Sequence, residues 1–508
     1  MRTKKSIYNI IITAVYYLQT TIIGLFLRRV FLSSLGLDYV GLDTVFANIL
    51  SFLALLELGI GPAITYRLYK PLSENDTHEI ACLMAVYKRF YRIVAAAICI
   101  IGIIVSFFIT TIIKEAPIEP SRLILCYYLY LSSTVASYLL AYKRSLLVAD
   151  QKQYLTVFVD LLVNFVVFVI KVVILRTTRN YVLILVINTI RVIISNTIIA
   201  LVCNHSYGNL EHDKPLSKDE VKQKSKGMLP DISYILLHKT CNYVYSSTDG
   251  IVISTFMGVA NVGLLANYNM IVSVISNLFM QCSSSIQSSI GNLVNSLDGG
   301  ITAVKMMLDR LSFLYFIILT FCTCALFCLL SPFVTLWLGS EFLISQSIVV
   351  VICLNLFIYS FYQPIANLYT VLGLFKGDKI TSPLAAITNI IVSISLVNSF
   401  GLIGVYVGTI LGSLIYIIGR TIIVFRHYFF ESPLMYLIKL LKYTVIAGIE
   451  VGVAYWCVNC LGDGLIEFVA KMAICVVLPG SINLLCFHKT DEFRYFKALF
   501  RRVVKKGL

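Results

Sequence analysis

Charged residues are scarce in this chain of 508 amino acids: they make up 13% of it, whereas apolar residues make up 58%. That balance lies far outside the range of soluble globular proteins, so it excludes an ordinary water-soluble fold. The charges fall mostly between apolar stretches of about 20 residues or more, long enough to cross a hydrocarbon core about 30 Å thick. The composition therefore predicts an all-α, polytopic membrane protein.

Signals for nucleotides, metals and secretion are also missing. No P-loop or other nucleotide fingerprint occurs, so ATP is not the expected energy source and no cofactor is expected. The six histidines show no metal-ligand spacing. The first apolar run is too long for a signal-peptide core of about 7 to 15 residues and lacks a small-residue cleavage site. It should therefore remain as the first transmembrane helix.

The cysteines carry no clear redox or metal pattern. Fourteen of them are scattered, largely within apolar stretches, where they are expected to be small reduced hydrophobic residues. Only Cys457 and Cys460 form a C-x-x-C motif. Neither flanking ligands nor a thioredoxin-like context accompanies it, so a redox or metal role is not favoured.

We predict about fourteen transmembrane helices from the apolar stretches. The expected ranges are 6–32, 39–68, 92–113, 122–148, 154–175, 181–203, 231–257, 264–291, 309–337, 345–373, 381–398, 402–425, 437–460 and 465–486. They form a six-helix lobe (1–203), a Lys-rich linker (204–230), a second six-helix lobe (231–426), two extra helices (427–486) and a basic tail (487–508). The linker is too short to be a domain.

Lys and Arg concentrate in alternate loops. The loops on the opposite side hold little beyond Lys114, Arg122, Arg176 and Arg179. The positive-inside rule then places both termini in the cytoplasm. The net charge of +15 is therefore a topology signal and not a sign of nucleic-acid binding, and the basic tail is expected to lie against anionic lipid headgroups.

A short pattern occurs twice in the chain. Leu35-Gly36 is followed by Val40-Gly41-Leu42, and Met257-Gly258 is followed by Val262-Gly263-Leu264, a constant offset of 222 residues. Chance matches of small residues are the alternative explanation. A parallel repeat of two six-helix bundles would place a substrate site between them near the midplane, an arrangement that supports alternating access.

Several segments carry a family resemblance. They are Arg28-Arg29-Val30-Phe31, Glu57-Leu58-Gly59-Ile60-Gly61-Pro62-Ala63-Ile64, Leu68-Tyr69-Lys70-Pro71, Tyr87-Lys88-Arg89-Phe90-Tyr91, Ala149-Asp150-Gln151-Lys152-Gln153-Tyr154, Ser247-Thr248-Asp249 and Ser289-Ile290-Gly291-Asn292. Together with the repeated pattern they resemble the Wzx-type polysaccharide flippases of the multidrug/oligosaccharidyl-lipid/polysaccharide exporter superfamily. The resemblance covers the first twelve expected helices, and its most specific segment is 57–64.

The resemblance implies a function and its partners. The expected cargo is an undecaprenyl-pyrophosphate-linked oligosaccharide, moved from the inner to the outer leaflet of a bacterial cytoplasmic membrane for O-antigen, capsule or exopolysaccharide synthesis. Membrane lipids and a polysaccharide polymerase are the expected partners. A multidrug exporter of the same fold is the alternative. A membrane-embedded glycosyltransferase, polymerase or ligase is disfavoured, because every loop on the expected outer side is only a few residues long.

Ionisable residues inside apolar stretches are expensive and are expected to face a protein interior. Arg191 lies about ten residues into the span 181–203, on one face with Asn188 and Ser195. The functional interpretation is a substrate-binding cation, and the alternative is a structural ion pair with a carboxylate such as Asp160. Either interpretation buries Arg191 between helices.

Arg28 and Asp43 form a second candidate pair. Arg28 continues a polar face of the first span, and Asp43 enters the second span at a similar depth. The alternative for Arg28 is snorkelling to the headgroups. The spacing of the two residues resembles that of an Arg and an Asp in lipid II flippases. Leu56 and Glu57 stand where those flippases carry a second Arg, which argues against lipid II as the cargo.

Uncharged polar stripes follow two later spans. One stripe consists of Asn269, Ser273, Asn277, Gln281, Ser284 and Ser288, and the other of Tyr359, Gln363, Asn367 and Thr370. Asn269, Gln281, Gln363 and Asn367 are our candidates for binding sugar hydroxyls. The alternative is that these stripes simply hold neighbouring transmembrane helices together.

A coupling-ion site is the last candidate. Asp249, Asn389 and Thr409 are expected at similar depths, and Asn389, Val405 and Thr409 reproduce the spacing of the sodium site in lipid II flippases, where Val contributes its carbonyl. Ser393 stands where that site supplies a second carboxylate, so weaker sodium binding is expected, or a proton at Asp249 instead. The alternative is a polar contact between helices.

Overall fold

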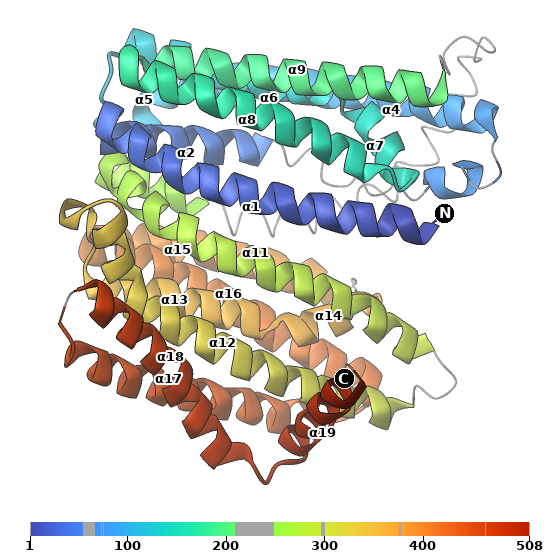
Figure 1. The fold of residues 1–508 in the computed structure, drawn as a ribbon, viewed down its shortest axis with the longest axis vertical. Helices are drawn as coiled ribbons and strands as arrows, with labels where there is room; N and C mark the ends of the chain where they lie inside the picture. The colour runs from blue at the N-terminus through green and yellow to red at the C-terminus, as the bar shows by residue number, and fades with distance from the viewer. Residues whose placement is uncertain are drawn as a thin grey trace. The chain divides into compact units, whose positions relative to one another are not determined.

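A computed structural model describes residues 2–53, 67–72, 74, 76–208, 248–295, 300–374, 377–462 and 464–506 (Figure 1). Within these ranges the secondary structure is helical, with no strand. The chain divides into two compact units, Met1–Gly263 and Leu264–Leu508. The resemblance segment 57–64 and most of the predicted linker lie outside the described residues.

The first unit is an all-helical bundle. Its helices are α1 (Arg2–Leu35), α2 (Leu37–Leu53), α4 (Thr77–Ser106), α5 (Ile109–Ile112), α6 (Pro120–Leu139), α7 (Ala141–Ala149), α8 (Gln153–Thr177) and α9 (Tyr181–Tyr207), and residues 248–257 are also helical. Helix α8 packs against both α1 and α9, and α6 packs against both α4 and α9. Side chains on α1, α2, α8 and α9 can therefore face one another inside the bundle.

The second unit is built around one long helix. Its helices are α11 (Val259–Asn295, which begins in the first unit), α12 (Ile301–Trp337), α13 (Gln346–Phe361), α14 (Gln363–Val371), α15 (Asp378–Phe400), α16 (Leu402–Val424), α17 (Leu434–Asn459), α18 (Leu465–Phe487) and α19 (Asp491–Lys506). Helix α12 packs against α13, α17 and α18. An aromatic core holds these helices together, with the rings of Phe316 and Tyr443 stacked at 4.7 Å.

The described helices confirm the predicted membrane fold. Ten of them are long and apolar enough to cross a membrane, and the number is eleven if α6 and α7, bent by 44°, count as one span. Most of the predicted spans coincide with these helices. The predicted span 437–460 coincides with α17, which is not one of the ten. The predicted spans 39–68 and 231–257 lie partly outside the described residues. The protein is therefore a multi-pass membrane protein.

Helical structure continues outside the ranges that hydropathy marks, most clearly at the start of α4 and in the tail. Helix α4 begins at Thr77 instead of near residue 92, because Asp76 caps it by accepting a hydrogen bond from the Glu79 amide at 2.9 Å. The tail forms helix α19, which packs Phe493 and Phe496 against the core of the second unit. Hydropathy finds only the apolar part of a helix, so it misses charged extensions that are held by caps or side-chain packing.

The repeated Gly pattern has the same local structure at both positions. Gly36 and Gly258 each separate two helices and have φ angles of +94° and +84°, a region that favours glycine. Within the first unit, a Cβ built on Gly41 would lie 1.9 Å from the Val259 carbonyl oxygen, and one on Gly263 would lie 2.6 Å from the Leu37 carbonyl oxygen. Since residues 37 and 41 correspond to 259 and 263, these reciprocal contacts support an internal repeat.

The division at Gly263 differs from the lobe boundary expected in the linker. Residues 248–257 belong to the first unit, although the sequence assigned the span 231–257 to the second lobe. Side-chain contacts explain this: Ser254 and Thr255 both donate hydrogen bonds to the Ile112 carbonyl, at 3.0 and 3.3 Å. The position of a helix in space, and not only its order in the chain, sets this division.

Candidate functional site

Three cations converge inside the first unit. We call Arg28 on α1, Lys171 on α8 and Arg191 on α9 the cationic cluster, and all three are half-buried. At 1.5 Å per residue, Arg28 and Lys171 each lie about 9 to 10 Å from the ends of their helices, and Arg191 lies about 15 Å from the start of α9. The cluster therefore lies well within the length of the spans.

Asp43 is the carboxylate associated with this cluster. It accepts a hydrogen bond from the Tyr181 hydroxyl at 3.2 Å, and the charges of Lys171 and Arg28 both act on it. The charges of Lys171 and Arg191 act on each other as well. Within the described part of the chain, Arg28 and Asp43 form no direct ion pair, so the pairing expected from the sequence is replaced by a longer-range interaction.

Arg191 is held by an amide. Its guanidinium donates to the Asn164 side-chain oxygen at 3.1 Å, and the Asn164 amide donates to the Tyr16 hydroxyl at 3.1 Å. Asp160, the carboxylate considered as its structural partner, instead binds Arg144 at 2.7 Å and accepts from Ser195 at 2.5 Å. Because Asn164 carries no charge, it orients the Arg191 guanidinium without neutralising it.

The balance of charge changes along the first unit. One turn before Asn164 on α8, Asp160 is bound by Arg144, and just before the start of α8, Asp150 is bound by Lys152 at 2.8 Å. In the cationic cluster, Lys171 and Arg28 both act on the carboxylate of Asp43, and Arg191 adds a third positive charge beside Lys171. A positive excess in an apolar bundle, with two guanidinium groups that can bind oxygen pairs, suits a phosphate or pyrophosphate group.

A second cationic surface lies along α4. An open pocket of about 440 Å³ is lined by Lys88, Arg89 and Arg92 together with small and apolar residues of the same helix. These residues belong to the charged extension of α4 that precedes its apolar part. Such a surface suits anionic lipid headgroups at the membrane interface.

Lys171 was missed by our sequence interpretation. It stands within the apolar run of α8, between Ile170 and Val172, and an isolated lysine in such a run is a functional candidate by default. Arg420 on α16 was also missed. It is buried in the second unit, its guanidinium donates to the Tyr362 hydroxyl, and it lies 4.8 and 4.9 Å from the ring centres of Tyr416 and Tyr369.

The polar stripe on α11 is exposed. Of its six members, the five whose side chains are described are exposed: Asn269, Ser273, Asn277, Gln281 and Ser284. Asn269 also accepts a hydrogen bond from the Tyr406 hydroxyl at 3.3 Å. A polar face of this length would be unfavourable against lipid. Its exposure therefore favours a surface that meets water or a polar ligand over a contact buried between helices.

Gln363 and Asn367 lie in a different environment. Both are buried in the second unit, with exposed fractions of 6% and 8%. The Asn367 amide donates to the Ser283 hydroxyl at 2.9 Å, and the Gln363 amide donates to the Tyr359 carbonyl at 3.4 Å. The Asn367 contact joins α14 to α11, and the Gln363 contact joins α14 to the end of α13. The burial of both residues therefore favours the alternative interpretation, a polar contact between helices of the bundle.

The predicted coupling-ion residues fall into two groups. In the second unit, Asn389 donates to the Thr409 hydroxyl at 2.9 Å, and Ser393 and Thr409 both donate to the Val405 carbonyl, at 3.1 and 3.3 Å. All of these side chains are buried between α15 and α16. Asp249 belongs to the first unit, so the structure describes it separately from this set. The four residues of the second unit therefore lie in contact, with the Asn389 amide nitrogen turned toward Thr409, and the ion site stays a prediction.

The fold is shared with solved transporter structures. No protein-family model matches the chain, and no curated protein is significantly similar to it in sequence. The structure is similar to the lipid II flippase MurJ in an inward closed conformation, with a TM-score of 0.69 and 16% identity, covering 94% of this chain and 99% of that one.

Two multidrug transporter structures are similar as well. An inward-facing multidrug resistance MATE family transporter of the MOP superfamily has a TM-score of 0.58 and 14% identity, covering 80% of this chain and 94% of that one. A mutant of the Vibrio cholerae MATE transporter VcmN has a TM-score of 0.55 and 11% identity, covering 85% and 98%. At these identities the comparisons show that the chain shares the fold of these solved structures.

Proposed function

We propose that this protein is a flippase that moves a polyprenyl-pyrophosphate-linked oligosaccharide across a bacterial cytoplasmic membrane by alternating access. The cationic cluster is the observation that carries the proposal. A pyrophosphate headgroup needs positive partners to leave water, and Arg28, Lys171 and Arg191 supply them inside the first unit. The exposed polar stripe on α11 offers hydrogen bonds suited to sugar hydroxyls.

The proposed orientation places both termini in the cytoplasm, so the loop between α8 and α9 lies outside. The cationic cluster then lies in the outer half of the membrane, and the pocket along α4 lies at the cytoplasmic interface. A headgroup would meet cations at its entry and again further along its path. An inside-negative potential of 100 mV assists outward movement of each negative charge by about 2.3 kcal/mol.

A multidrug exporter of the same fold is the competing function, because MATE transporters share the fold. The charge of the first unit argues against a cationic drug, which would be repelled by Arg28, Lys171 and Arg191. An anionic lipid headgroup is attracted by the same three residues. The two functions therefore predict opposite substrate charge.

The test is transport of a fluorescent polyprenyl-pyrophosphate oligosaccharide in proteoliposomes. We expect Lys171→Gln and Arg191→Ala to insert normally and to lose at least about 10-fold in rate, since each removes a desolvated positive partner worth 1.4 kcal/mol or more. Arg176→Ala is the matched control, because Arg176 is exposed at the end of α8. Equal rates in all three variants would refute the assignment.

A cellular experiment identifies the cargo. Depletion of the protein should cause one lipid-linked oligosaccharide to accumulate on the cytoplasmic face of the membrane. Accumulation of lipid II would identify the peptidoglycan precursor instead, and accumulation of neither would support the exporter. Sodium is proposed as the coupling ion at Asn389, Ser393, Val405 and Thr409, and Asp249 in the first unit is proposed separately as a proton acceptor.

A further inference from the structure

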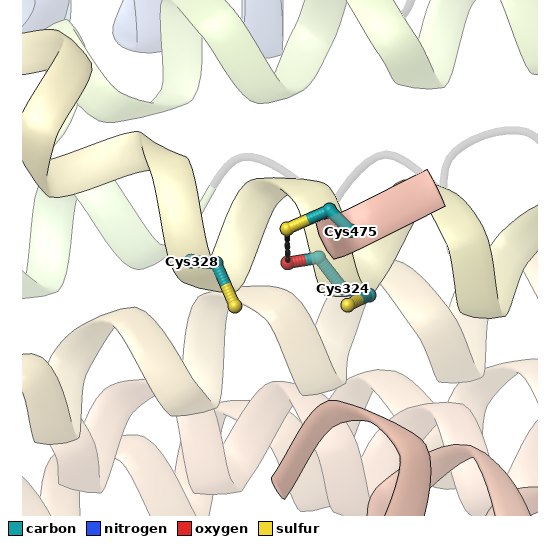
Figure 2. Close-up of side chains that lie close together, drawn as sticks. All are labelled: Cys324, Cys328 and Cys475. Atoms are coloured by element: carbon teal, nitrogen blue, oxygen red, sulfur yellow. Dashed lines mark hydrogen bonds between the residues drawn. The ribbon is translucent and has the colours of Figure 1, made fainter. Parts of the chain in front are cut away.

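Three buried cysteines converge in the second unit. Cys324 and Cys328 lie one turn apart on α12, and Cys475 approaches them from α18 (Figure 2). Their exposed fractions are 0%, 3% and 1%. The three sulfur atoms all lie within 4.8 Å of one another, and the Cys475 thiol donates to the Cys324 carbonyl at 3.9 Å.

The side chains packed against these sulfur atoms are mostly apolar, and the charge of one buried carboxylate, Glu450 of α17, acts on Cys324. Ala454 and Val458 of α17 complete the buried cluster, and Val451 and Leu478 pack against it. Cys475 lies about ten residues into α18, which places the cluster about 15 Å from the end of that helix. This is close to the middle of a hydrocarbon core about 30 Å thick.

Single buried cysteines need no special explanation, because a thiol packs as a small hydrophobic side chain. The convergence of three thiols from two helices is a different observation. Among the described residues, this is the one group of three or more Cys, His, Asp or Glu side chains whose ligand atoms lie close enough to hold a metal ion. Cys457 and Cys460, the motif visible in the sequence, do not belong to it.

We propose that Cys324, Cys328 and Cys475 bind Cu⁺. Sulfur ligands select soft ions such as Cu⁺ and Zn²⁺. Zinc in structural sites takes four ligands, whereas three sulfur atoms satisfy Cu⁺, which is stable with two or three.

Metal binding at this cluster is coupled to proton release. Cysteine binds a metal as the thiolate, so each thiol that forms a copper–sulfur bond loses one proton to the solvent. The bound ion then offsets part of the negative charge that forms among buried side chains, where uncompensated charge is costly.

A bound ion would connect α18 to α12. These two helices already pack together, and α18 belongs to the C-terminal pair that follows the two predicted lobes. The ion would fix the depth of α18 relative to α12, since its ligands come from both helices. This role is independent of the cargo, so the binding site can be tested without a transport assay.

The test measures Cu⁺ binding to the purified full-length protein in detergent, anaerobically, by competition with a coloured Cu⁺ chelator. We expect one tight site per chain. Cys475→Ala should weaken binding at least about 10-fold, because loss of a direct ligand should exceed the 10- to 100-fold effects seen for outer-shell partners. The matched control is the double variant Cys457→Ala/Cys460→Ala, which should bind as the unmodified protein does.

Two further measurements keep the proposal falsifiable if Cys475→Ala does not fold. Cys328→Ala removes a ligand from the other helix, and X-ray absorption of the unmodified copper-loaded protein should show three sulfur neighbours. Absence of tight Cu⁺ binding, or binding that survives loss of Cys328 or Cys475, would overturn the site. A parallel titration with Zn²⁺ alone distinguishes the ions, and tighter binding of Zn²⁺ would overturn the choice of copper.

Discussion

The reciprocal glycine contacts make the sharpest prediction about how the fold is held together. Replacing Gly41 by Ala adds a Cβ that would lie 1.9 Å from the Val259 carbonyl oxygen, and the neighbouring carbonyl carbon lies at 2.7 Å. Both atoms belong to backbone, so no side chain can rotate away. The helices would have to separate, which also disturbs the equivalent contact of Gly263 with the Leu37 carbonyl.

The expected size follows from two opposing effects. Alanine is favoured over glycine in a helix interior by about 0.5 to 1 kcal/mol. Forcing an extra carbon into a packed interface costs about 1 to 3 kcal/mol, and more where the backbone must shift. Gly452 and Gly448 on α17 are matched controls, because a Cβ at either position meets nothing within 4 Å. The gain in helix propensity is common to both variants, so Gly41→Ala and Gly452→Ala should differ by the packing cost alone, about 1 to 3 kcal/mol.

Thermal unfolding in detergent, followed by fluorescence-detected size exclusion, measures this difference. One kcal/mol corresponds to about 2 to 4 °C for a domain of 150 to 250 residues, so the Gly41→Ala midpoint should fall several degrees below that of Gly452→Ala. Gly263→Ala should fall in the same way. Equal midpoints for Gly41→Ala and Gly452→Ala would refute the close approach and remove this support for the repeat.

Further predictions concern coupling and the C-terminal helix. If protons couple through Asp249, Asp249→Asn should abolish proton-stimulated flipping in proteoliposomes and leave headgroup binding intact; an unchanged response to a proton gradient would exclude Asp249. Thr409→Val removes the acceptor of the buried Asn389 amide, so it should cost about 1 to 3 kcal/mol of stability whether or not sodium binds, and a stable variant with normal sodium response would refute both roles. Partial burial raises the pKa of Glu492, but the hydrogen bond and charge of Lys439 outweigh it and lower this pKa. Docking of α19 should therefore be strongest above the unfolded Glu pKa of about 4.3 and weaken as pH falls below it. Limited proteolysis of α19 against pH measures this, and Glu492→Gln should remove that part of the pH dependence.

The helices could be predicted from the sequence because membrane insertion depends on a local property. A run of about 20 apolar residues is readable without knowledge of its neighbours. The start of α4 could not be predicted in this way. It depends on the N-cap residue Asp76 and on charged residues whose hydropathy is low. Helix α19 was missed for the same reason, since its position depends on the packing of Phe493 and Phe496 and on the ion pair between Lys439 and Glu492.

The polar residues were harder to assign than the helices, because a side chain's role depends on partners far along the chain. Asp160 and Arg191 lie at a spacing that allowed a pair, yet Asp160 binds Arg144 and Arg191 binds Asn164. The contact set of Asn389, Ser393, Val405 and Thr409 was more accessible to the sequence, since it joins two consecutive helices with a short connection. Short connections restrict which residues can meet.

The cluster of Cys324, Cys328 and Cys475 was the feature least predictable from the sequence. Cys324 and Cys475 are separated by about 150 positions, and neither flanking sequence marks them as ligands. The C-x-x-C of Cys457 and Cys460 has the familiar spacing but no third partner among the described residues. In a helical membrane protein, ligands come together through helix packing and not through a continuous motif. Metal sites in such folds should therefore be sought as i, i+4 pairs that face a distant helix, the arrangement that Cys324 and Cys328 present to α18.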